Sequence, residues 1–262
     1  MRIGFGALRL CGSHGFEPTR DRAAARDVLR RAVDLGVTLI DTADSYGLGD
    51  NEELIAEALH PYPADLVIAT KAGQSRPSRG AWVPLGRPEY LRQQAELCLR
   101  RLRVERIELF QLHRVDPQVP LADQVGPLRD LRDEGKIAHI GLSEVTVDQL
   151  EEATKIAPIA SVQNLYNWAD RRHDDVVEYC TRQGTAFLPW LPVAGGRHHP
   201  ALAALAAAVG ATPAQVALVW LLHRSPVMVP IPGTRSPDHL ADNVRAASIE
   251  LDRAQLERVP RG

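Results

Sequence analysis

Eight short apolar runs, each followed by a longer segment of helical periodicity, constrain the fold of this chain more than any other feature. The runs are mostly continuous rather than alternating, as expected for parallel strands that are covered on both faces. Eight strand-then-helix units in 262 residues predict an α/β fold, the (β/α)8 TIM barrel, which typically takes ~250 residues. The predicted strands are residues 3–7, 37–40, 66–70, 107–112, 138–142, 159–163, 185–189 and 227–230.

The boundaries of the predicted helices carry start and stop signals. Glycine can adopt the left-handed conformation that ends a helix, and three predicted helices stop at a glycine just before an apolar run. Small polar residues at a helix N-terminus accept hydrogen bonds from its free backbone N–H groups. The glycine stops are Gly36, Gly135 and Gly184, and the predicted N-caps are Asp50, Thr212 and Ser236. For Asp50 we expect a capping box with Glu53.

A doubly wound sheet is the competing α/β architecture, and its usual sign is a glycine-rich phosphate-binding turn after the first strand. The stretch GFGALR, residues 4–9, begins like such a turn, but Arg9 stands where the third glycine is needed. The residues that follow indicate a loop rather than a capped helix. We therefore favour the barrel. No linker or low-complexity segment divides the chain, so we expect residues 1–262 to form a single domain.

Charge and cysteine content narrow the class of protein. The formal net charge is -2 at pH 7, which gives no electrostatic reason to expect binding to nucleic acid or to an anionic membrane. The 3 cysteines do not suggest a disulfide framework. We find no signal-peptide pattern and no apolar run near the ~20 residues that span a bilayer. We expect a soluble cytoplasmic protein that is a monomer or a weak homo-oligomer.

Ionisable residues concentrate directly after the predicted strands, where barrels of this kind place their active sites. Asp41 and Tyr46 follow the second strand, Lys71 the third and His113 the fourth. Each residue alone could be a solvated or capping side chain. Four such residues after three successive strands are harder to explain in that way, so we treat them as one site.

These four side chains suit the reduction of a carbonyl group. Tyrosine, with a solution pKa of ~10, donates a proton poorly at neutral pH, and a lysine ammonium beside it should lower that pKa. An aspartate can hold the lysine in place, and a histidine N–H can stabilise negative charge on a carbonyl oxygen. The hydride must come from another group, which indicates a nicotinamide cofactor.

The segment after the eighth predicted strand indicates a phosphate site. Gly233 and Thr234 lead into a helix that should start at Ser236, and helix N-termini bind anions. Arg235 adds a cation suited to the 2′-phosphate of NADP. A plain turn with a surface arginine would leave the same pattern.

Two tryptophans are candidates for the walls of the site. Trp190, after the seventh predicted strand, could face the nicotinamide ring. Trp82, in the long loop after the third strand, could line a substrate pocket together with Tyr46 and His113. Packing roles for both tryptophans are equally consistent with the sequence.

The chain resembles the aldo-keto reductase family nearly end to end. The resemblance rests on the order and spacing of GVTLIDTADSYG, LVIATKAG, QLHRVDP, IAHIGLSEVT, SVQNLYNWADR and PIPGTRSPDHLADN. It implies a (β/α)8 barrel, NADPH as cofactor and a catalytic tetrad of Asp41, Tyr46, Lys71 and His113. The stretches ALHPYP and VQNLYN resemble those of a branch of bacterial family members that are similar to pyridoxal reductases.

The same resemblance implies a set of cofactor contacts. Ser143 and Gln163 match ligands of the nicotinamide carboxamide, whereas the third such ligand, an asparagine in the family, is Glu144 here. Trp190 stands where a tyrosine more usually stacks on the nicotinamide. The other implied cofactor contacts are Gly6, Asp41, Leu191, Pro192, Val193, Gly233, Thr234, Arg235, His239, Asp242 and Asn243.

From these features we expect an NADPH-dependent oxidoreductase that reduces small-molecule aldehydes or ketones to alcohols, with Tyr46 as proton donor. The reverse reaction would act on CH–OH donors, and no metal is expected. Two other interpretations stay open. One is a barrel lyase in which Lys71 forms a Schiff base with its substrate. The other is a non-catalytic barrel that binds a nicotinamide cofactor.

Overall fold

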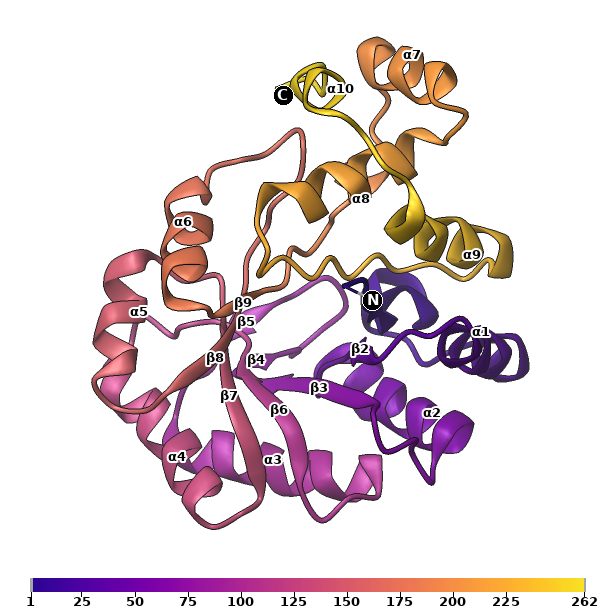
Figure 1. The fold of residues 1–262 in the computed structure, drawn as a ribbon. Helices are drawn as coiled ribbons and strands as arrows, with labels where there is room; N and C mark the ends of the chain where they lie inside the picture. The colour runs from indigo at the N-terminus through magenta and orange to yellow at the C-terminus, as the bar shows by residue number, and fades with distance from the viewer. Residues whose placement is uncertain (1, 262) are drawn as a thin grey trace.

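Parallel strands form the centre of the molecule, and helices lie outside them (Figure 1). We describe residues 2–261 in a computed structural model. One sheet contains seven strands in the order β1-β2-β3-β6-β7-β8-β9, and all neighbouring pairs are parallel. The strands are β1 (Phe5–Gly6), β2 (Leu39–Asp41), β3 (Val67–Ala72), β6 (Ile107–Leu112), β7 (Ile137–Ser143), β8 (Ile159–Gln163) and β9 (Ala186–Phe187).

The eighth predicted strand, residues 227–230, closes the barrel without forming a regular strand. Val229 N donates to the backbone oxygen of Phe187 in β9 (2.8 Å), and Gly4 N donates to that of Pro230 (2.9 Å). Prolines in and beside this segment lack the N–H groups of a regular ladder, so the prediction of a full strand is wrong. The segment nevertheless joins β9 to the chain before β1, and the predicted (β/α)8 barrel is confirmed.

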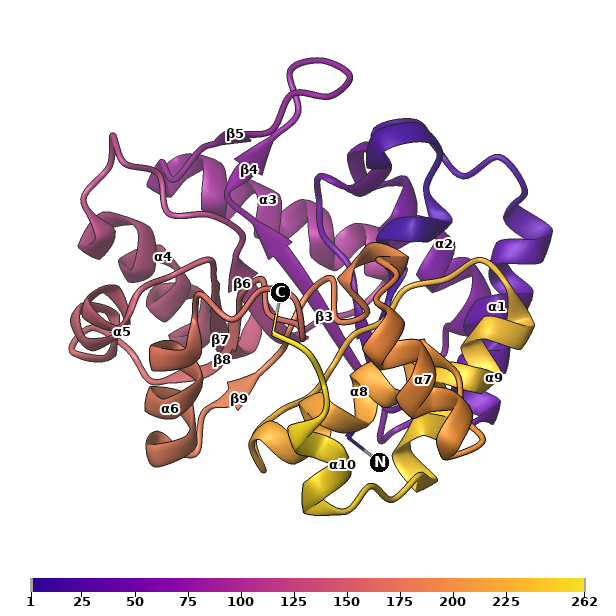
Figure 2. The ribbon, with the colours of Figure 1, turned by 90° about the horizontal axis from the view of Figure 1, so that it is seen from above.

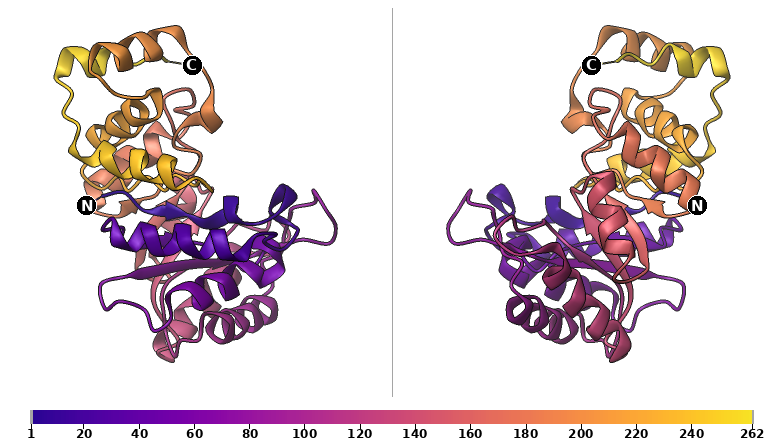
Figure 3. Two further views of the ribbon diagram at one scale, coloured as in Figure 1. Left: turned by 90° about the vertical axis from the view of Figure 1, so that its right-hand side faces the viewer. Right: turned by 90° about the vertical axis from the view of Figure 1, so that its left-hand side faces the viewer.

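Within residues 2–261, six α-helices pack around the sheet and four more follow β9 in the last third of the chain (Figures 1 and 3). The first six are α1 (Arg22–Asp34), α2 (Asp50–Leu59), α3 (Pro88–Leu102), α4 (Leu121–Asp133), α5 (Val147–Thr154) and α6 (Asp174–Gln183). The others are α7 (Pro200–Ala208), α8 (Pro213–Arg224), α9 (Pro237–Arg245) and α10 (Arg253–Glu257). Figure 3 shows α7 and α10 as a further layer beyond α8 and α9.

Most of the predicted helix signals operate as expected. Gly36, Gly135 and Gly184 have φ values of 86°, 78° and 70°, so each takes the left-handed conformation that ends a helix. Thr212 and Ser236 are N-caps whose hydroxyl oxygens accept hydrogen bonds from backbone N–H groups three residues further on (3.2 and 3.3 Å). These predictions are confirmed.

The prediction for Asp50 is wrong. Gly49 is the N-cap of α2, and Asp50 is the first residue of the helix. The Asp50 carboxylate instead accepts a hydrogen bond from Thr19 N (2.8 Å) and forms an ion pair with Arg22. This tertiary pairing ties the start of α1 to the start of α2 and competes successfully with local capping.

The long loop after β3 contains a two-stranded antiparallel hairpin that the sequence analysis did not predict. It consists of β4 (Gln74–Ser75) and β5 (Val83–Pro84), and Figure 2 shows it projecting from the barrel beyond the end of β3. The hairpin therefore rises beside the C-terminal ends of the strands.

No single helix within residues 2–261 has the length and apolar composition needed to cross a membrane. Helices α7 and α8 meet that criterion only when taken together across a bend of 89°.

Candidate active site

A cavity of about 430 Å³ lies at the C-terminal ends of the barrel strands. Three predicted catalytic side chains line it, namely Asp41, Tyr46 and His113, and Trp82 forms part of its wall. Lys71 does not line the cavity because it is fully buried. The predicted cofactor contacts on the cavity wall are Gly6, Gln163, Trp190, Leu191, Pro192, Val193 and Gly233.

Asp41 and Lys71 form a buried ion pair, with side chains 4% and 0% exposed. Lys71 Nζ lies 2.7 Å from Asp41 Oδ2 and donates a second hydrogen bond to the backbone oxygen of Thr42 (2.7 Å). The other carboxylate oxygen, Oδ1, accepts hydrogen bonds from Gln163 Nε2 (2.7 Å) and Gln111 Nε2 (3.2 Å). Because these groups come from β2, β3, β6 and β8, the barrel itself fixes the geometry of the pair.

Tyr46 and His113 meet above this ion pair. The centres of their rings are 5.8 Å apart, and Lys71 Nζ lies 5.1 Å from the centre of the Tyr46 ring. Tyr46 begins the 3-10 turn η3 (Tyr46–Gly49), which leads directly into α2. His113 Nδ1 is 3.3 Å from Ser45 Oγ. The loop after β2 therefore supplies both the phenol and a hydrogen-bond partner for the imidazole.

Burial controls the protonation of these side chains. It raises the pKa of Tyr46 well above its usual value, and the charge of Asp41 acts in the same direction, while Arg114 opposes it. The lowering of the Tyr46 pKa that was expected beside Lys71 is not found, because burial and the charge of Asp41 raise this pKa instead. Burial also lowers the pKa of His113 well below its usual value, and the charges of Lys71 and Arg114 add to that effect. At neutral pH Tyr46 is protonated and His113 is neutral.

Arg76 contacts Trp82, the residue of the cavity wall that lies beside Tyr46 and His113. Its guanidinium lies 3.5 Å from the centre of the Trp82 ring and donates to the backbone oxygens of Gly15 (3.0 Å) and Ser45 (3.3 Å). Trp82 in turn meets Tyr46 and His113 edge-on at 6.3 and 6.2 Å. Sequence reasoning missed Arg76, since its partners lie 61 and 31 residues away along the chain.

Arg114 and Gln163 line one side of the cavity, whereas the predicted cofactor contact Ser143 is buried beside them and lines neither pocket. Arg114 Nη1 donates to Ser143 Oγ (3.0 Å) and to the backbone oxygen of His113 (2.6 Å). Ser143 Oγ donates to the backbone oxygen of Gln163 (2.8 Å). Arg114 lines the cavity but was not a predicted site residue. Its place directly after His113, at a strand end, is the signal that the sequence offers.

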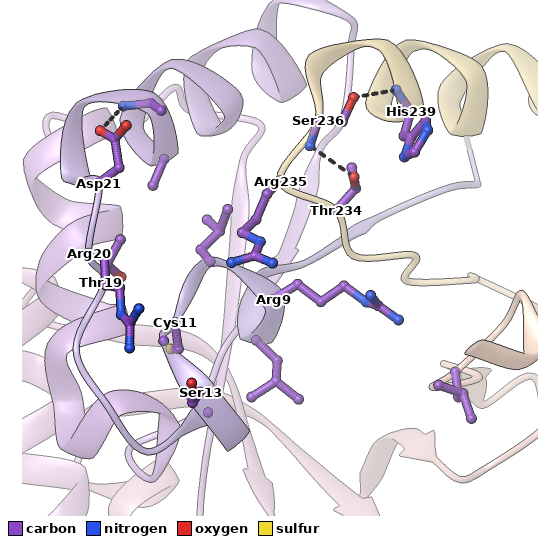
Figure 4. A pocket seen from close by; sticks show the side chains of 17 residues that line it. Arg9, Cys11, Ser13, Thr19, Arg20, Asp21, Thr234, Arg235, Ser236 and His239 are labelled. Atoms are coloured by element: carbon purple, nitrogen blue, oxygen red, sulfur yellow. Dashed lines mark hydrogen bonds between the residues drawn. The ribbon is translucent and has the colours of Figure 1, made fainter. Parts of the chain in front are cut away.

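A second pocket, of about 800 Å³, adjoins the first and shares Leu8, Arg9 and Leu191 with it. The predicted phosphate contacts Thr234, Arg235 and His239 line this pocket. Arg9 and Arg20 line it as well, and Figure 4 shows Arg235 and Arg9 on neighbouring segments with their side chains extending in different directions and Arg20 on the opposite side. This pocket is therefore rich in cations.

Gly6 and Gly233 lie where two backbone segments approach each other closely. A Cβ atom at Gly233 would lie 2.4 Å from the backbone oxygen of Gly6, and one at Gly6 would lie 2.7 Å from that of Ile231. No other residue fits at either position without moving the backbone. A cationic pocket at one end and the Gln163 side chain in the cavity at the other fit an extended, anionic dinucleotide cofactor.

Asp242 and Asn243 do not line either pocket. Asp242 forms an ion pair with Arg245 (2.7 Å), and its backbone oxygen accepts a hydrogen bond from Gln215 Nε2 (3.0 Å). Asn243 is buried on α9. Of the three residues expected on this helix, only His239 reaches the pocket wall.

Comparison with known proteins identifies the family of this chain. The model of the aldo/keto reductase family matches residues 2–261. The chain belongs to the aldo/keto reductase family. An uncharacterized oxidoreductase of Schizosaccharomyces pombe is 46% identical to it over 253 residues, which cover 95% of this chain and 82% of that protein. The pyridoxine 4-dehydrogenase of Escherichia coli is 40% identical over 268 residues, covering 97% and 92%.

A solved structure of an aldo-keto reductase from Klebsiella pneumoniae, in complex with NADPH, has the same fold. Its TM-score is 0.84 at 26% sequence identity, and the match covers 100% of this chain and 92% of that one. The family predicted from the sequence is thereby confirmed, and with it the class of oxidoreductases and the family's cofactor, NADP(H). Within residues 2–261, no group of three or more His, Cys, Asp or Glu side chains is arranged to hold a metal ion.

Proposed function

We propose that this protein is an NADPH-dependent reductase of aldehydes or ketones. The observation that carries the proposal is that Tyr46, His113 and Asp41, which is paired with the buried Lys71, line one cavity that adjoins an arginine-rich pocket. A structurally similar member of the family has been solved in complex with NADPH. The proposal goes beyond family membership in naming the direction of reaction, the class of substrate and the proton donor.

The residues that would hold the cofactor lie along both pockets. Arg235 and the N-terminus of α9 suit the 2′-phosphate, and Arg9 adds a second cation beside them. Gln163, together with Ser143 that donates to its backbone oxygen, suits the nicotinamide carboxamide, and Trp190 offers a flat ring on the same cavity wall. When bound, NADPH supplies the hydride that reduces the carbonyl carbon.

The protonation states of the site match the proposed roles. A protonated Tyr46 can give its proton to the oxygen of the reduced carbonyl group. If Ser45 Oγ donates to Nδ1, a neutral His113 carries its hydrogen on Nε2 and can donate it to the same oxygen. Lys71 and Asp41 then act through Tyr46, since the ammonium 5.1 Å from the ring centre favours the phenolate that remains after proton transfer.

The Schiff-base alternative has little support. Lys71 is 0% exposed and its Nζ is hydrogen bonded to Asp41 and to the Thr42 backbone, so no substrate carbonyl can reach a free amine there. A non-catalytic, cofactor-binding barrel is disfavoured by a cavity lined with a proton donor, an imidazole and a tryptophan. We therefore retain the reductase as the function.

A cofactor titration followed by a substrate panel tests the proposal. NADPH and NADH fluorescence titrations should give tighter binding of NADPH. Oxidation of NADPH should then be followed with a panel of aldehydes and ketones, in which pyridoxal is included because of the Escherichia coli relative. Turnover of at least one carbonyl compound is expected. Cofactor binding without turnover across a broad panel would favour the non-catalytic interpretation instead.

A further inference from the structure

Glu144 occupies an unusual backbone position directly after Ser143, at the end of β7. Its φ is 55°, in the left-handed region that is unfavourable for residues other than glycine and asparagine. Such conformations persist only where surrounding contacts hold them, and they occur often at functional sites. The contacts of the Glu144 side chain therefore indicate what this position does.

The Glu144 carboxylate is held on both of its oxygens. Oε1 accepts hydrogen bonds from the indole Nε1 of Trp190 (2.6 Å) and from the backbone nitrogen of Leu165 (2.5 Å). Oε2 lies 3.7 Å from His173 Nε2. Although burial raises the pKa of this carboxyl group, its contacts with His173, Leu165 and Trp190 lower it to about 2. The side chain is therefore an ionised acceptor at neutral pH.

An ionised carboxylate is a poor substitute for the asparagine that the family resemblance predicts at this position. It has no N–H to donate to a carboxamide oxygen, and here its Oε1 atom already serves two donors. Its neighbours Ser143 and Gln163 keep the groups expected to bind the carboxamide. Glu144 thus differs from Ser143 and Gln163 because it can only accept hydrogen bonds, and it accepts them from Leu165 and Trp190.

Trp190 is the side chain that Glu144 orients. Its ring is half-buried and lines the catalytic cavity, and its backbone nitrogen donates to the oxygen of Asn164 (3.2 Å). An indole N–H that is removed from water needs an acceptor. Glu144 supplies that acceptor from the end of β7, which is separated from β9 by β8, so the indole is held at its N–H edge as well as at its backbone.

We propose that Glu144 is a positioning residue: it holds the Trp190 indole as the flat surface on which the nicotinamide ring stacks, and it does not contact the carboxamide itself. This inference rests on the proposed function, because it needs NADPH as the ligand. Glu144 in place of the family's asparagine and Trp190 in place of its more usual tyrosine then form one paired change. The indole N–H of Trp190 receives the charged carboxylate of Glu144 as its acceptor.

A double-mutant cycle on cofactor binding tests this role. The variants are Glu144→Ala, Glu144→Gln, Trp190→Phe and the double variant Glu144→Ala/Trp190→Phe. Dissociation constants are measured by fluorescence titration for NADPH and for adenosine 2′,5′-bisphosphate, which lacks the nicotinamide half. Thermal unfolding of each variant reports on its fold. Phenylalanine keeps a flat ring at position 190 but removes the N–H group, and Gln keeps an acceptor oxygen at position 144.

Glu144→Ala should weaken NADPH binding by about tenfold, since the lost bond joins an N–H to a charged acceptor. Binding of adenosine 2′,5′-bisphosphate should change less than about twofold, and Glu144→Gln should stay within about threefold of wild type for NADPH. In the Trp190→Phe background, Glu144→Ala should add almost nothing, because the acceptor no longer has an indole N–H to hold.

Three results would overturn the inference while leaving the proposed function intact. They are equal weakening of both ligands by Glu144→Ala, independent effects of Glu144→Ala and Trp190→Phe that multiply in the double variant, and a loss in Glu144→Gln as large as in Glu144→Ala. Failure of the wild-type protein to bind NADPH would refute both this inference and the proposed function.

Discussion

Lys71→Met tests how much the buried ion pair between Lys71 and Asp41 contributes to stability. Methionine has a similar length but no charge, so Asp41 keeps its two glutamine partners and loses the ammonium 2.7 Å away. Both side chains of the pair are almost fully buried. Removing one partner of such a pair leaves an uncompensated charge and costs about 3–5 kcal/mol of folding free energy. For a chain of this size, that corresponds to a fall in Tm of roughly 10 °C.

Urea unfolding at pH 7 measures this cost, with a second variant as the matched control. In Lys71→Met/Asp41→Asn the charge on Asp41 is removed as well, and an amide oxygen remains to accept from Gln163. The double variant should recover most of the loss, ending within about 1–2 kcal/mol of wild type. The reasoning is refuted if the double variant is no more stable than Lys71→Met, or if Lys71→Met is as stable as wild type.

Three further predictions concern other parts of the structure. Arg235→Ala should raise the dissociation constant for NADPH about tenfold and that for NADH much less, because only NADPH carries the 2′-phosphate; fluorescence titration of both cofactors measures the difference. Gly233→Ala should destabilise the protein by about 1–3 kcal/mol in urea unfolding, since a Cβ there would lie 2.4 Å from Gly6 O. Burial and the charge of Glu52 raise the pKa of Asp44 to about 8, so the folded state keeps a proton that the unfolded chain loses near pH ~4, and this contribution to stability is lost as the pH rises through about 8. Asp44→Asn should therefore raise the urea midpoint relative to wild type, and do so more at pH 8.5 than at pH 5; an equal change at both values would contradict this reasoning.

The sequence predicted the barrel because its strongest signals are local. Apolar runs and glycine stops such as Gly36 and Gly184 depend on residues close in the chain, and the structure places them as expected. The eighth strand differs for a reason that is also visible in the sequence, since prolines cannot donate to a ladder. Asp50 differs because Arg22 and Thr19, far from it in sequence, take its carboxylate.

Within the site, the sequence predicted which residues follow the strands but not how they are paired. The gathering of Asp41, Tyr46 and His113 at one cavity follows from the common direction of parallel strands. The high pKa of Tyr46 could not be predicted, because it depends on burial and on the charge of Asp41, which the fold brings close to the phenol. The roles of Arg76 and of the Glu144–Trp190 hydrogen bond could not be predicted either, because both depend on contacts between loops far apart in the sequence.

The central claim is that Tyr46 gives the proton in the reduction of a carbonyl group, and Tyr46→Phe tests it most directly. Phenylalanine preserves the ring beside Trp82 and His113 but has no proton to donate. The measurement is kcat for an aldehyde that the wild-type enzyme reduces, with the NADPH dissociation constant determined on the same preparation. We predict that kcat falls by about 10²–10⁴-fold while NADPH binding stays within about twofold. A variant that binds NADPH and keeps kcat close to that of the wild type would contradict the account.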